Sequence, residues 1–128
     1  MRTRTLIPGV LLGLVACSAS ATSDQPAPGS PDVADAITIN LADFMIDPSE
    51  LEAVGPTVTL EVTSDGPTPH NLTVRDADGE VMMATEDLSA GDTDTISGDL
   101  EPGEYTIFCS FAGHESLGMR GTLTVSGS

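Results

Sequence analysis

Sulfur and nitrogen donors gather near one end of this 128-residue chain. A thiol, an imidazole and a thioether follow one another at Cys109, His114 and Met119, and His70 is the one other histidine in the sequence. Soft sulfur together with imidazole favours copper, and two histidines, one cysteine and a more distant methionine form the donor set of copper centres that transfer electrons. The residue types therefore predict that these four side chains bind a single copper ion.

The segments that carry the donors have the alternation expected of β-strands. His70 shares its parity with Leu72, and Cys109 shares its parity with Ile107, in two short alternating runs. Because residues of equal parity point to the same face of a strand, both donors are expected to point inward if those apolar side chains line the core. The other two donors follow in the loop after Cys109, so all four are expected to converge at one end of the fold.

Alternating segments separated by turn residues fill the chain after residue 36, and none has the length or period of a long helix. The segments are Ile37–Leu41, Val58–Val62, Leu72–Val74, Thr93–Ile96, Tyr105–Cys109 and Thr122–Val125. Short strands with Gly, Pro and Asp between them predict an all-β fold, an antiparallel sandwich or barrel. The stretch from Met82 to Ser89 fits either a short strand or one helical turn.

The N-terminal part has the layout of an export signal. Two arginines precede an apolar run that is too short to span a bilayer, and small residues follow it. The run ends in Leu-Val-Ala-Cys, which resembles the lipobox of bacterial lipoproteins and makes Cys17 the expected site of lipidation; cleavage after Ala21 is the alternative. We expect a signal over 1–17, a disordered tether over 18–36 that lacks apolar periodicity, and a copper domain over 37–128.

The mature chain is strongly acidic. All 20 acidic residues follow Cys17, where Arg75 and Arg120 are the only basic residues, so this part carries a formal charge of −18. Such a charge argues against nucleic acid as a partner and speeds encounter with positively charged protein faces, although it could also serve solubility alone. Cys109 would be the one free thiol of the exported domain, and a lone thiol there is reactive, paired with another chain, or held by a metal.

The sequence Pro69-His70-Asn71, followed by a Cys-x4-His-x4-Met loop, resembles the small type 1 (blue) copper proteins of the cupredoxin family. The loop spacing is most like that of auracyanin, azurin and sulfocyanin. One departure is Ala112, where relatives commonly carry proline. The resemblance covers about residues 37–125 and implies a Greek-key β-sandwich.

In such a protein the copper lies below the surface, with one edge of His114 exposed as the route for the electron. The resemblance implies that Asn71 ties the two ligand-bearing segments together. Small and apolar neighbours of His114 would form a docking patch, or a cap that keeps water from the metal. The docking patch comprises Phe111, Ala112, Gly113, Leu117 and Gly118.

The expected function is that of an extracytoplasmic single-electron carrier, monomeric and lipid-anchored. It would shuttle electrons between membrane-associated redox proteins of the cytochrome or copper oxidase type through small, short-lived contacts. An enzyme is not expected, because the chain has no further histidines for a second, substrate-facing centre. A copper carrier or trafficking protein is the alternative. Met45, Met82 and Met83 stand outside the donor cluster and are expected to serve packing, with a transient contact to Cu(I) as the lesser alternative.

Overall fold

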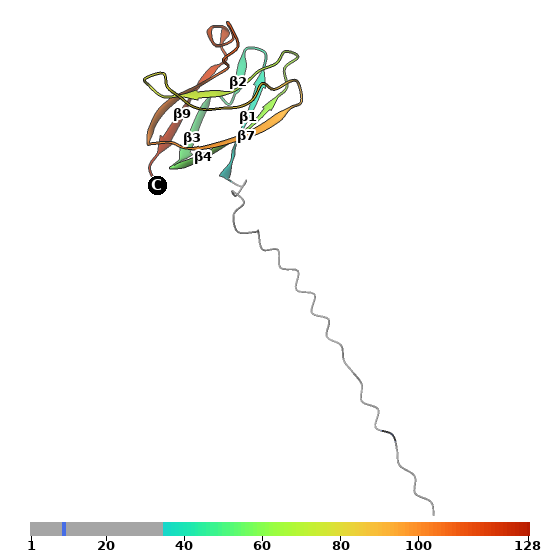
Figure 1. Ribbon diagram of the computed structural model, residues 1–128, viewed down its shortest axis with the longest axis vertical. Helices are drawn as coiled ribbons and strands as arrows, with labels where there is room; N and C mark the ends of the chain where they lie inside the picture. The colour runs from blue at the N-terminus through green and yellow to red at the C-terminus, as the bar shows by residue number, and fades with distance from the viewer. Residues whose placement is uncertain (1–8, 10–34) are drawn as a thin grey trace, which may run out of the picture. The chain divides into compact units, whose positions relative to one another are not determined.

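Two β-sheets face each other in the computed structural model, which describes residue 9 and residues 35–128 (Figure 1). The elements in this part of the chain are β1 (Ile37–Ala42), β2 (Met45–Asp47), β3 (Glu50–Val54), β4 (Thr57–Ser64), β5 (Thr73–Arg75), β6 (Val81–Ala84), β7 (Thr93–Asp99), β8 (Gly103–Phe108), the short 3₁₀ segment η2 (Glu115–Leu117) and β9 (Arg120–Ser126). The predicted all-β sandwich is confirmed, and this described part of the chain contains no long helix. Apart from residue 9, the expected signal with Cys17 and the tether as far as residue 34 lie outside the described residues.

The sheets are mixed rather than purely antiparallel. One has the strand order β2-β1-β4-β7 and the other the order β3-β9-β8-β5-β6. β1 runs parallel to β4, and β3 runs parallel to β9. The prediction of an antiparallel arrangement was wrong for these two pairs, because the chain changes sheets between β2 and β3 and then returns to lay β4 beside β1.

Six predicted strands are present with slightly different ends, and the ambiguous stretch after Met82 contributes to β6. Two strands were missed. β2 has three residues and β3 has five, and each buries a single large side chain, Ile46 and Leu51 respectively. Segments this short and this acidic carry little strand propensity of their own, so their pairing with β1 and β9 decides their conformation.

The core lies between the sheets and follows the period of two. In β4, Val58, Leu60 and Val62 are buried, while the residues between them are partly exposed. Leu72 and Ile107, which share parity with the two expected donors of the second sheet, are fully buried. Full burial of each such side chain stabilises the fold by about 1.5–3 kcal/mol.

The central pairing of the second sheet brings the donor-bearing segments to one end of the sandwich. β5 and β8 are antiparallel neighbours, with Thr73 opposite Phe108. The segment before β5 and the segment after β8 therefore emerge together. The β8–β9 loop lies at this end, at the top of Figure 1, whereas the C-terminus lies at the opposite end of the sandwich.

Within residue 9 and residues 35–128, no helix is both long enough and apolar enough to cross a membrane.

Candidate metal centre

Three of the four expected donors meet at this end of the fold. One ligand atom each from His70, Cys109 and His114 lies within 4.8 Å of the other two. The Cys109 Sγ atom is 3.6 Å from His114 Nδ1, and the two imidazole rings are 5.3 Å apart. His70 and Cys109 are fully buried, and His114 is partly exposed. The parity argument for the first two donors is therefore confirmed in their burial.

Met119 completes the loop and is fully buried. Its main chain closes the loop on both sides, because its carbonyl accepts a hydrogen bond from the Cys109 N–H (3.1 Å) and its N–H donates to the His114 carbonyl (3.0 Å). Gly118, at a positive φ of 118°, ends the 3₁₀ turn η2 just before it. These bonds fix the positions of the three loop donors relative to one another.

The spacing and the hydrogen bonding of these donors fit a metal ion. Ligands about 2.0–2.3 Å from a common metal lie about 3.5–3.8 Å apart, which is close to the Cys109 to His114 separation. The Nδ1 atom of His70 is buried without a hydrogen-bond partner among the described residues. A buried polar atom without a partner is costly, so this nitrogen calls for a ligand of another kind.

The other ring nitrogen of His70 has a partner that the sequence did not reveal. His70 Nε2 lies 3.1 Å from Asp43 Oδ1, and the Thr68 hydroxyl donates to the same oxygen (2.7 Å). The hydrogen bond from Thr68 is the main cause that holds the pKa of the Asp43 carboxyl below its ordinary value; burial opposes it, and the contact with His70 adds to the lowering. The carboxylate is thus kept in the form that accepts the imidazole N–H.

A buried glycine makes this contact possible. A Cβ atom at Gly66 would lie 2.5 Å from His70 Nε2 and 2.9 Å from Asp43 Oδ1. Both distances are below van der Waals contact, so a larger residue would push the two groups apart. Gly66 therefore forms one wall of the histidine site.

Asn71 links the two segments that carry the donors. Its Oδ1 accepts a hydrogen bond from the Ser110 N–H (2.8 Å), and its Nδ2 lies 2.8 Å from the Ser110 hydroxyl. Nδ2 also donates to Asp87 (3.0 Å). Because Asn71 follows His70 and Ser110 follows Cys109, one side chain sets the distance between the two strand ends.

An ion pair holds the ligand loop to the second sheet. The Arg75 guanidinium binds both carboxylate oxygens of Glu115, the residue after His114, and one of the two contacts measures 3.2 Å. The same guanidinium stacks on the Phe108 ring at 4.2 Å. Since both charged groups are about 70% buried, this pair is less screened than an ordinary surface pair.

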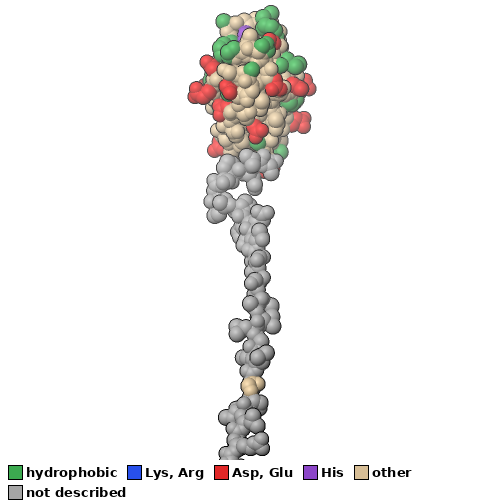
Figure 2. All heavy atoms as spheres, turned by 90° about the vertical axis from the view of Figure 1, so that its right-hand side faces the viewer, with side chains coloured by type: hydrophobic (Ala, Val, Ile, Leu, Met, Phe, Trp, Pro, Cys, Tyr) green, Lys and Arg blue, Asp and Glu red, His purple; other side chains and the backbone are tan. Residues whose placement is uncertain are grey.

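The surface around His114 is apolar. Of the expected docking patch, Ala112, Gly113, Leu117 and Gly118 are exposed, and Phe111 is partly buried. The Phe111 ring packs against His114 at 5.6 Å. Figure 2 shows hydrophobic side chains around the visible histidine at one end of the domain and acidic side chains along its flanks.

The β1–β2 turn adds a residue to this surface that the sequence did not point to. Phe44 is 47% exposed and meets His114 edge to face, with 5.5 Å between the ring centroids. Phe44 has a φ of 59°, a left-handed conformation that costs a bulky residue about 1–2 kcal/mol. Strain of this kind is typical of functional positions. One turn therefore supplies Asp43 to one histidine and Phe44 to the other.

The remaining methionines do not share one role. Met83 packs against the core, as expected, whereas Met45 and Met82 are exposed, so the packing interpretation was wrong for those two.

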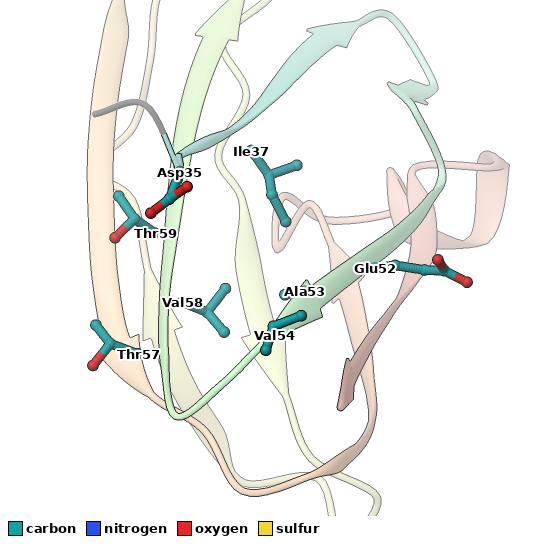
Figure 3. A pocket seen from close by; sticks show the side chains of 8 residues that line it. All are labelled: Asp35, Ile37, Glu52, Ala53, Val54, Thr57, Val58 and Thr59. Carbon is teal, nitrogen blue, oxygen red and sulfur yellow. The ribbon is translucent and has the colours of Figure 1, made fainter. Parts of the chain in front are cut away.

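A groove of about 420 Å³ lies elsewhere on the domain, between residues of β1, β3 and β4 (Figure 3). No sulfur or imidazole lines it. Its two carboxylates, Asp35 and Glu52, point in different directions (Figure 3). The groove therefore lacks the donor chemistry of the centre described above.

The chain belongs to the family of cupredoxin-like domains, whose family model matches residues 9–125. Among solved structures, it is similar to a dithionite-reduced auracyanin of the photosynthetic bacterium Roseiflexus castenholzii (21% identity, TM-score 0.66, 72% of this chain and 97% of that one). It is also similar to auracyanin B (20% identity, TM-score 0.64, 71% of this chain and 88% of that one). A third similar structure is a purple cupredoxin of Nitrosopumilus maritimus (29% identity, TM-score 0.52, 70% of this chain and 98% of that one). Comparison with curated proteins finds no match.

Copper is the metal of this family, and the chain carries a His, Cys, His, Met group suited to it. The predicted family and cofactor are therefore confirmed. Together, the family and the donor group support a copper electron carrier.

Proposed function

We propose that this protein is a single-electron carrier of the type 1 copper class, with His70, Cys109, His114 and Met119 as the ligands of one copper ion. The observation that carries the proposal is the convergence of three donor atoms within 4.8 Å at a buried position. Copper bound there would cycle between its Cu(I) and Cu(II) states. With every strong position filled by a protein side chain, no place is left for a substrate, which favours transfer of an electron over bond chemistry.

The chain's own residues would keep the donors in nearly one geometry for both oxidation states. Asn71 fixes the distance between the strand ends, and the Met119 main chain closes the loop that holds Cys109, His114 and Met119. Burial of Cys109 keeps water from the thiolate. A donor set that needs little rearrangement suits rapid electron exchange and argues against the trafficking alternative, which requires easy release of the metal.

We propose that electrons pass through the exposed edge of His114. The docking patch defined above, extended by Phe44, surrounds this residue and offers an apolar face to a partner. The acidic flanks favour a redox partner that carries positive charge around its own contact face (Figure 2). Such a contact would be small and transient, in keeping with a shuttle that acts as a monomer.

The proposed place of action is outside the cytoplasm, next to membrane-bound redox proteins. This part of the proposal rests on the export signal and on Cys17 as the lipid-bearing residue. Full-length protein expressed in a bacterial host should fractionate with membranes, and Cys17→Ser should release it. If the wild-type chain is soluble and begins after Ala21, the lipid anchor is refuted.

The visible and paramagnetic spectra of the protein with one equivalent of Cu(II) test the copper centre. An intense thiolate-to-copper band is expected, and Cys109→Ser should abolish it. Met119→Leu should keep much of the band but shift the reduction potential, whereas Met45→Leu, the matched exposed methionine, should change neither. The absence of the band in the wild-type protein would refute the proposed function.

Copper exchange separates the carrier of electrons from the carrier of metal. The electron carrier should lose Cu(I) and Cu(II) slowly to an excess of chelator while it reacts rapidly with small redox reagents. Fast loss of copper to the chelator in both oxidation states would favour trafficking instead.

A further inference from the structure

We propose that Asp43 is a positioning residue of the copper centre. Its carboxylate holds His70 in one tautomer and orientation and, by its negative charge, favours Cu(II) over Cu(I). This inference rests on the proposed function, and it assigns to the β1–β2 turn a role in setting the reduction potential.

The hydrogen bonds determine where the imidazole proton lies. A neutral imidazole has one N–H, and an ionised carboxylate can only accept. Since His70 Nε2 is 3.1 Å from Asp43 Oδ1, the proton must be on Nε2, which leaves the lone pair of Nδ1 free. Nδ1 is the buried nitrogen without a partner among the described residues, so the free lone pair is on the atom that remains available to a metal ion.

The carboxylate is itself held in place. The Thr68 hydroxyl donates to the same Asp43 oxygen at 2.7 Å. Its distance from His70 Nε2 is longer, 3.4 Å, so the hydroxyl proton points to the carboxylate and not to the ring. Gly66 closes the other side, where a Cβ would meet both groups. An acid that served only the charge of the surface would need neither a hydroxyl aimed at it nor a glycine against it.

The charge of Asp43 acts on the metal through the ring. A carboxylate that accepts the N–H of a metal-bound imidazole raises the basicity of the ligand. Its negative charge also attracts the ion more strongly at charge +2 than at +1. Both effects favour Cu(II) and lower the reduction potential, although the effect of charge is moderated because Asp43 is 36% exposed.

Three variants separate the hydrogen bond from the charge. Asp43→Asn removes the charge but keeps a hydrogen-bond acceptor, and Asp43→Ala removes both. Asp65→Asn is the matched control, because Asp65 is an exposed acid beside Gly66 for which the described structure gives no side-chain hydrogen bond. Each variant is measured without metal, by ¹⁵N NMR of the His70 ring, and with copper, by potentiometric titration.

Asp43→Ala should let the His70 proton distribute over both ring nitrogens and should weaken Cu(II) binding by about 10–100-fold. Each tenfold loss in the preference for Cu(II) over Cu(I) raises the potential by about 59 mV. Asp43→Asn should keep the Nε2–H tautomer and raise the potential by less, and Asp65→Asn should change neither quantity.

The inference is overturned if Asp43→Ala and Asp65→Asn give the same potential and the same His70 tautomer as the wild-type protein. The tautomer is measured in the metal-free protein, so it tests the Asp43 contact even if the wild-type protein shows no thiolate-to-copper band. The missing band would count against the proposed function and against the effect on potential, while a changed tautomer would still support the positioning contact.

Discussion

Removal of the Asn71 side chain should weaken the join between the two ligand-bearing segments. Asn71 is 9% exposed, and its amide contacts three groups, which are the Ser110 N–H, the Ser110 hydroxyl and the carboxylate of Asp87, an exposed acid. Each contact contributes about 1 kcal/mol, since water screens the one that involves charge. Asn71→Ala should therefore lower the free energy of unfolding of the metal-free protein by about 3 kcal/mol, part of it because the Ser110 N–H loses its partner.

A second asparagine offers the control. The Oδ1 atom of Asn40, on β1, is buried without a hydrogen-bond partner in the described part of the chain. Because this oxygen makes no hydrogen bond that Asn40→Ala could remove, the variant should lower the free energy of unfolding by at most about 1 kcal/mol.

Equilibrium unfolding in urea, followed by circular dichroism and extrapolated to zero denaturant, measures both variants. The slope of the unfolding free energy against urea concentration should stay unchanged. If the two variants unfold within about 0.5 kcal/mol of each other, the hydrogen bonds of Asn71 do not hold the segments together and the reasoning is wrong.

Three further perturbations address the β8–β9 loop, the segment between β2 and β3 where the chain changes sheets, and the negative charge of the surface. Arg75→Ala should destabilise the domain by about 1–2 kcal/mol, because Glu115 loses its bidentate partner and a stacked cation is removed, whereas exposed Arg120→Ala should cost less than 0.5 kcal/mol in the same urea titration. Gly121→Ala should destabilise the domain by about 3 kcal/mol or more, since the new Cβ would lie 2.1 Å from the Ser49 carbonyl oxygen. A circular dichroism melt in which this variant is as stable as the wild-type protein would contradict the close approach of Gly121 to Ser49. Stopped-flow rates of electron exchange should fall with rising salt for a cationic redox reagent and rise for an anionic one, and equal salt dependence for both would argue against steering by the acidic surface.

The sequence predicted the core of the fold well because its signal is local. The period of two in β4 and β8 marks their buried faces directly, and the donor spacing in the β8–β9 loop depends only on neighbouring residues. These features could be read without knowing which strand pairs with which.

Features that depend on distant contacts were missed. β3 is a strand because it pairs with its neighbour β9, which is distant in sequence. Its acidic composition gives no local sign of a strand. Asp43 precedes His70 by 27 residues in a turn like many others, and nothing in the local sequence marks it as the partner of the ring. Phe44 likewise reads as an isolated aromatic residue until the turn brings it to His114.

The position of the C-terminus, at the end of the sandwich opposite the β8–β9 loop, has a practical consequence (Figure 1). A domain attached to a gold electrode through a thiol added after Ser128 would present His114 to the electrolyte. Surface plasmon resonance on the gold would then measure the binding of soluble redox partners at the proposed contact face, because the support lies at the far end of the domain.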